Sequence, residues 1–192
     1  MSVRHSLARI TGTFASNFDL LPRERGDLVR HGVAATAIDT PTPVRAGHVV
    51  FGDDGRFSFE QHERSLSVRS ARAFLFLIED MHGEPSDIVA WQPALSRVAS
   101  WRGTAWGIGQ SEAYAMRMAE HDGLPVWRNP LDWLRAGRRG VVIMRPRLAA
   151  AWLNDAGPLV AEDFEHAREL RTALTRPAPR ILVPAALRRQ AA

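Results

Sequence analysis

The feature that most constrains this chain is a series of short β-prone runs separated by turn residues. Residues 49–51 and 56–59 flank Gly52-Asp53-Asp54-Gly55, and Asp-Gly between such runs is the strongest short-range signal for a β-hairpin. Further runs at 73–78, 87–91 and 96–108 are separated by turn residues of the same kind. The pattern predicts an antiparallel meander over residues 73–108, with a tight hairpin around Arg102-Gly103.

The C-terminal half carries helix signals that alternate with short strands. Asn129 and Pro130 provide a helix N-cap and a first-position proline, and Gly137 ends that helix. Asp163 caps a later helix. Other helices are expected after Ser111 and Pro146, and strands at 140–144, 158–161 and 181–183. This alternation predicts a small parallel sheet made of β-α-β units.

Together these patterns predict an α+β fold, with an antiparallel β-meander in the middle of the chain followed by a small β-α-β-α-β C-terminal part. At 192 residues and 45% hydrophobic composition, the chain is expected to form a single globular domain, 1–192. Residues 1–45 give the weakest pattern, so we expect partly irregular backbone there. The tail, residues 176–192, is rich in Pro, Ala and Arg and is expected to be flexible.

Several classes of protein are disfavoured by what the sequence lacks. The longest apolar run, residues 73–78, is far shorter than the roughly 20 residues of a membrane-spanning helix. The N-terminus shows no secretory signal, so we expect a cytoplasmic protein without membrane contact. The absence of cysteine excludes disulfides, thiolate nucleophiles and cysteine-ligated zinc.

Positive charge in this chain comes from arginine alone and is concentrated in the C-terminal half. Residues 1–96 hold 10 Arg against 12 Asp and Glu, whereas residues 97–192 hold 15 Arg against 9 acids. Guanidinium stays protonated and forms forked hydrogen bonds with phosphate. Such a block is typical of a polyanion-binding protein, although an arginine-biased composition on a solvated face accounts for it equally well.

The densest basic segment lies between residues 128 and 147, where Asp132 is the one acidic residue. Within it, residues 135–140 combine three arginines with two glycines, which let backbone amides approach an anion. We interpret this loop as exposed, so that its arginines can be replaced without loss of the fold. The candidate nucleic-acid-binding residues are Arg128, Arg135, Arg138, Arg139, Arg145 and Arg147.

Two acidic groups follow expected strands and are candidates for a metal site. Glu162, Asp163 and His166 open a predicted helix, and Glu79 and Asp80 end a predicted strand. If they met in space, their carboxylates would form the type of cluster that binds Mg²⁺ or Mn²⁺ in phosphoryl-transfer enzymes. Helix capping and turn formation explain the same acids without a metal.

Common catalytic motifs are absent from the sequence. There is no G-x-S-x-G elbow and no P-loop, and no two histidines lie at the helical spacing of a zinc site. The general burial tendency of tryptophan places Trp91, Trp106, Trp133 and Trp152 in the core.

Four blocks of the chain carry a resemblance to a known group of proteins. They are residues 87–91, 103–107, 130–137 and 161–163. They resemble uncharacterised proteins encoded by prophages and mobile elements of GC-rich proteobacteria. The resemblance implies a genomic setting and no catalytic residue.

Three functional hypotheses follow. The leading one is a non-enzymatic, nucleic-acid-associated accessory protein of a mobile element, with no cofactor. The second is a metal-dependent nuclease or phosphoryl-transfer enzyme, which would need Mg²⁺ or Mn²⁺. The third is a protein-interaction or assembly module that uses the Trp-rich meander as its interface.

Overall fold

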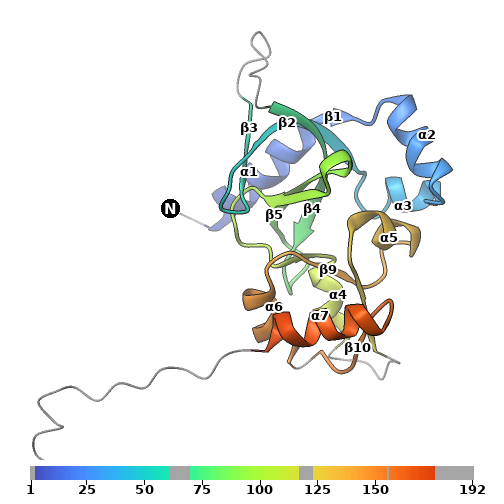
Figure 1. Ribbon diagram of the computed structural model, residues 1–192. Helices are drawn as coiled ribbons and strands as arrows, with labels where there is room; N and C mark the ends of the chain where they lie inside the picture. Colours follow the sequence, from blue (N-terminus) through green and yellow to red (C-terminus); the bar gives the residue numbers. More distant parts are fainter. Residues whose placement is uncertain (1–2, 61–69, 117–122, 155, 176–192) are drawn as a thin grey trace, which may run out of the picture.

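The computed structural model describes residues 3–60, 70–116, 123–154 and 156–175. It shows an α+β fold with two sheets (Figure 1), which confirms the predicted class. The helices are α1 (Val3–Ala15), α2 (Pro22–Arg30), α3 (Ala35–Asp39), α4 (Gln110–Met116), α5 (Pro130–Arg135), α6 (Pro146–Leu153) and α7 (Phe164–Leu174).

The larger sheet contains the predicted hairpin and meander and is antiparallel throughout. Its strands are β1 (Phe18–Asp19), β2 (Arg45–Phe51), β3 (Phe57–Phe59), β4 (Ser70–Glu79), β5 (Pro85–Gln92) and β6 (Arg97–Ser100). They run in the order β1-β2-β4-β5-β6, with β3 paired to β2. The turn at residues 52–55 joins β2 to β3, as its Asp-Gly signal predicts.

The smaller sheet is a mixed sheet in the C-terminal part of the chain and contains the strands predicted at 140–144 and 158–161, whereas the strand predicted at 181–183 lies outside the described residues. Its strands are β7 (Gly107–Ile108), β8 (Leu124–Trp127), β9 (Val141–Ile143) and β10 (Leu159–Val160), in the order β10-β8-β9-β7. Strands β10, β8 and β9 are parallel, and β7 is antiparallel to β9. Helix α5 connects β8 to β9, and α6 connects β9 to β10.

Two details of the smaller sheet differ from the sequence pattern. The hairpin expected at Arg102-Gly103 is wrong, because β7 pairs with β9 instead of returning along β6. Strand β8 was not expected, since Gly123 and Pro125 act as breakers in a local pattern. Strands β7 and β8 pair with strands more than ten residues away in the sequence. Local sequence signals carry no information about such distant pairing.

Residues 3–39 are largely helical, where the sequence pattern indicated irregular backbone. Helix α2 begins with Pro22, and the Glu24 carboxylate accepts the Leu21 N–H at 2.8 Å, a capping arrangement. The helix is followed by Gly32, whose φ of +87° suits glycine. Since Arg72 on β4 donates to Glu24 at 2.5 and 2.9 Å, α2 is also joined to the sheet.

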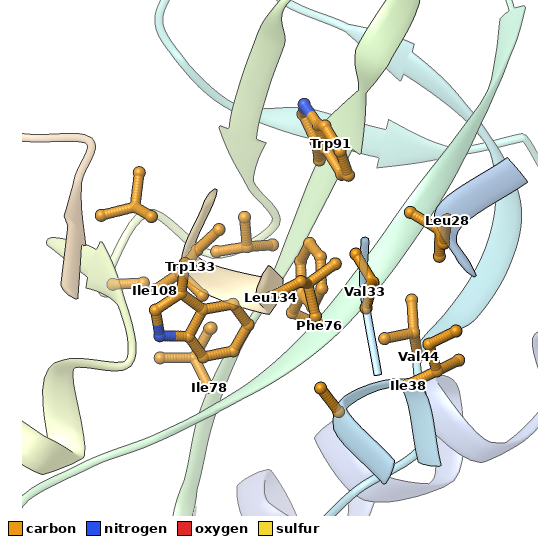
Figure 2. Packing of buried hydrophobic residues seen from close by; sticks show 14 residues of the cluster. Leu28, Val33, Ile38, Val44, Phe76, Ile78, Trp91, Ile108, Trp133 and Leu134 are labelled. Atoms are coloured by element: carbon orange, nitrogen blue, oxygen red, sulfur yellow. The ribbon is translucent and has the colours of Figure 1, made fainter. Parts of the chain in front are cut away.

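The alternation of side chains along β4 and β5 gives the larger sheet two buried faces. Leu75 and Ile88 pack on one face with Ile10 and Phe14 of α1. Phe74, Phe76, Val89 and Trp91 lie on the other face, in a cluster with residues of α2, α3 and α5. Figure 2 shows Phe76 and Trp91 with Leu28, Ile38 and Trp133 of these helices.

The cluster that contains Phe76 and Trp91 also joins the two sheets. Ile108 and Val142 come from β7 and β9, and they pack in the same cluster as Phe76 of β4. Figure 2 shows Ile108 and Phe76 in this cluster. Three of the four tryptophans expected in the core are buried, and the fourth, Trp152, is 37% exposed. Among the described residues, no helix is long and apolar enough to cross a membrane.

Candidate nucleic-acid interface

The candidate arginines differ in their surroundings: some donate to backbone carbonyls, one pairs with carboxylates, and others are exposed. Arg138 is the most enclosed of them. Its Nε donates to the Ala37 carbonyl at 2.6 Å and an Nη to the Ile38 carbonyl at 3.2 Å. The guanidinium lies 5.6 Å from the Trp133 ring centroid, a cation–π contact. Burial lowers the Arg138 pKa to about 10, so the side chain remains charged at neutral pH.

Arg138 therefore joins the loop after α5 to the N-terminal part of the chain. Arg135, Gly137 and Arg139 of this loop are exposed, as the sequence pattern indicated, whereas Arg138 is half-buried. Arg135, in the last turn of α5, makes a second such connection: its Nε donates to the His31 carbonyl at 2.5 Å and its Nη1 to Asp132 at 2.8 Å. Both arginines contact segments about 100 residues away in the sequence.

Arg128 is surrounded by carboxylates and is neutralised by them. Its guanidinium contacts Glu162 at 3.1 Å, Asp163 at 2.6 Å and Glu169 at 3.4 Å. The hydrogen bond with Asp163 is the main cause that raises the pKa of Arg128 and lowers the pKa of Asp163 well below its usual range. This cluster fastens α7 to the end of β8. Its three carboxylates outnumber the one guanidinium, so its net charge is negative and disfavours an external anion.

Arg145 is held by backbone carbonyls and lies beside a second arginine. It donates to the carbonyls of Gly103 and, at 3.5 Å, Gly55. A Cβ built on Gly103 would lie 2.7 Å from Arg56 Nε and 3.0 Å from Arg145 Nη1, so both guanidinium groups lie against this glycine. The nearest carboxylate described for either is Asp54, 3.7 Å from Arg56 Nε. We call this pair, with Gly103, the Arg56–Arg145 site.

The loop that carries Gly103 is organised by Asp87, a residue that sequence reasoning missed. Its side chain is fully buried, and its two oxygens accept four backbone N–H groups and one hydroxyl at 2.8 to 3.0 Å. The donors are Ile88, Arg102, Thr104 and Ala105. Asp87 thus fixes the chain between the two sheets, and with it the carbonyl that holds Arg145.

Arg139 and Arg147 are exposed. The carbonyl of Arg139 accepts the Trp127 indole N–H at 2.7 Å, which fixes the backbone while the side chain faces solvent. Arg147 lies in the first turn of α6, two residues after Arg145. Both are placed where a polyanion can approach.

The two acidic groups form separate local structures. Asp80 accepts the backbone N–H groups of His82 and Glu84, which is ordinary turn chemistry. Glu79 contributes its carbonyl to a hydrogen bond with Gln110. In the described ranges, no three side chains of His, Asp or Glu are grouped to hold a metal ion.

At the other acidic group, Asp163 and His166 serve the start of α7. Asp163 accepts the His166 backbone N–H at 2.7 Å as the helix N-cap. His166 is buried, and its Nδ1 accepts the Glu162 N–H at 3.2 Å, which places the proton of a neutral ring on Nε2. Capping and the Arg128 ion pairs therefore account for these polar groups.

A pocket of about 430 Å³ lies between α2, the Trp91 end of β5 and the turn before α5. Its apolar walls are Leu28, Phe74, Trp91, Pro93 and Leu131, and its polar edge is Asp27, His31, Ser96 and Asn129. The His31 Nδ1 lies 2.8 Å from the Asp27 carbonyl. Since a carbonyl only accepts, Nδ1 carries the proton and Nε2 of the neutral ring is an acceptor.

Sequence reasoning missed both Arg56 and this pocket. Arg56 is far from Arg145 in the sequence, and the hairpin turn that carries it is recognisable only as a turn. Comparisons with protein-family models, curated proteins and solved structures found no match.

Proposed function

We propose that this protein binds nucleic acid without catalysing a reaction, and that the Arg56–Arg145 site is its primary phosphate contact. Exposed Arg147 and Arg139 would extend the basic surface. The proposed role is that of an accessory protein of a mobile element, the genomic setting that the resemblance to prophage and mobile-element proteins implies.

One observation carries the proposal: the guanidinium groups of Arg56 and Arg145 lie against the same glycine, Gly103, and the described hydrogen-bond acceptors of the Arg145 side chain are carbonyls. The ion pair described for Arg56, with Asp54, is long at 3.7 Å. A carbonyl fixes a guanidinium without cancelling its charge, and five N–H donors leave several for a phosphate. Two adjacent like charges repel each other, and an anion between them removes that repulsion. A phosphate that accepts from both arginines meets these requirements.

Two of the other predicted arginines stabilise the fold and are less suited to contact a phosphate. Arg128 is neutralised by acids, and Arg138 is largely enclosed by α3 and Trp133. We therefore assign them supporting roles in the proposal, while Arg135 remains partly exposed beside the pocket.

The test is the affinity for fluorescein-labelled 20-nucleotide single- and double-stranded DNA, measured by anisotropy at low salt. Arg56→Gln is expected to weaken binding about tenfold, which corresponds to about 1.4 kcal/mol. Arg30→Gln removes the same charge from an exposed arginine paired with Asp27 and is expected to keep most of the affinity. Absence of binding by the wild-type protein, or equal losses in both variants, would overturn the proposal.

The pocket favours a second candidate function, the binding of a small planar heterocycle. Its volume is within the range of ligand sites, and it combines apolar walls with a few polar groups. Phe74 and Trp91, whose ring centroids are 5.6 Å apart, offer an aromatic surface. The His31 acceptor suits a ring with an N–H donor, such as a nucleobase.

Thermal shift with nucleosides tests this second candidate. A bound nucleoside is expected to raise the Tm of the wild-type protein through linkage, and ribose alone is not. His31→Ala removes an exposed side chain, so it should fold normally but lose the shift. A nucleoside shift that persists in His31→Ala, or no shift in the wild type, would exclude the assignment.

A further inference from the structure

The edge of the smaller sheet at β10 is open in the part of the chain that the structure describes. β10 pairs with β8 on one side, and no described strand pairs with its other side. Val160 on this strand is 46% exposed. An unpaired edge with an exposed β-branched residue is a template for another strand.

A groove runs beside this edge. It has a volume of about 620 Å³ and is lined by residues of α6, β10 and α7, including Ala150, Leu159, Leu170 and Leu174. The groove reaches Thr175, the last of the described residues. The continuation of the chain therefore starts at the groove itself.

The sheet topology indicates what should follow α7. Connections between parallel strands are right-handed, so two successive crossovers in the same direction place their helices on the same face. Strand β10 lies two positions from β9 in the sheet, on the far side of β8. Helix α6 connects β9 to β10. Helix α7 packs beside α6 (Figure 1), as required if the next strand lies one position further in that direction.

A β-prone segment follows α7 in the sequence at a length that allows such a connection. Ile181-Leu182-Val183 follows Leu174 after six residues, a usual length for a connection from a helix to a strand. These residues are apolar and two are β-branched, which suits a strand covered by a helix. They lie outside the described residues, as does the strand predicted there from the sequence.

We propose that Ile181-Leu182-Val183 of the same chain adds to β10 as a parallel edge strand and closes the groove beneath α7. The added strand satisfies the open backbone groups of β10 and covers the apolar side chains of Leu170 and Leu174. The inference does not depend on nucleic-acid binding.

Introduced cysteine pairs test the proposal in the full-length protein, which has no other thiol. Val160→Cys is combined in turn with Ile181→Cys, Leu182→Cys and Val183→Cys, and with Ala191→Cys as the matched control. The effective concentration of each pair is measured against glutathione. A flexible tether gives values near the millimolar range, and docking predicts a value at least about tenfold above the Ala191 control for one of residues 181–183.

Equal effective concentrations for all four pairs would overturn the proposal, as would disulfides that form only between two molecules. A second measurement covers the case in which a cysteine pair distorts the edge. Leu182→Asp should lower the Tm by about 2 to 4 °C or more, as expected for the loss of a buried apolar contact in a chain of this size. Ala191→Asp should not, and equal Tm values for the two variants would also contradict docking.

Discussion

At the scale of single residues, Asp87 is the polar group on which the fold depends most. Replacing it with Ala leaves four backbone N–H groups without this acceptor, and each unsatisfied buried group costs about 1–3 kcal/mol. We expect Asp87→Ala to lower the free energy of unfolding by about 3 kcal/mol or more, measured by urea denaturation. Asp53→Ala, at an exposed turn, should change it by about 0.5 kcal/mol or less. Similar values for both variants would contradict this role.

Arg138 gives a second prediction at this scale, because its neighbour provides a matched control. Arg138→Ala removes two hydrogen bonds to carbonyls and the contact with Trp133, and hydrogen bonds of a charged group contribute about 1.5–3 kcal/mol. We expect a loss of about 2 kcal/mol in the free energy of unfolding. Arg139→Ala should be nearly neutral in the same assay. If the two variants unfold alike, Arg138 does not connect the loop to α3.

At the scale of elements, α7 should make stability depend on pH through Asp163. The pKa of Asp163 is lowered by its hydrogen bond with Arg128, so its contribution is full above the unfolded value of about 4. It is lost as the pH falls through the lower folded value. Asp163→Asn keeps an N-cap residue but removes the charge, so its Tm should lie below the wild-type Tm at pH 7 and approach it between about pH 4 and pH 2. Glu165→Gln is the control, and a constant difference across this range would contradict the ion pair.

The start of a helix could be predicted from the sequence where a single N-cap residue defines it. Asn129 accepts the backbone N–H groups of Leu131 and Asp132, and Asp163 caps α7, as their positions before apolar helices indicate. Strand β8 was missed because Pro125 lies within it, although its partners β9 and β10 determine its place. A sequence pattern reports the conformational preference of a segment by itself. Pairing with distant strands can override that preference, as it does for β8.

At the scale of the whole molecule, the arginines of the basic segment contact different parts of the fold. Arg128 contacts α7, Arg138 contacts α3, and Arg145 contacts the turn at Gly55. The fold distributes neighbouring arginines among different partners, whereas it brings Arg56 to Arg145 from a distant hairpin. The α+β class could be predicted from local pattern. The composition of the candidate site could not, because it depends on how the two sheets meet.

The most direct test of the proposed function is the salt dependence of DNA binding by the wild-type protein and Arg56→Gln. Each phosphate contact contributes about 0.7 to 0.9 to the slope of log K against log salt concentration. Contacts from both Arg56 and Arg145 predict a slope magnitude of about 1.5 or more for the wild type, lowered by about 0.7 to 0.9 in Arg56→Gln and unchanged in Arg30→Gln. Binding that is absent at low ionic strength, or a slope that Arg56→Gln leaves unchanged, would contradict the assignment of the Arg56–Arg145 site to phosphate.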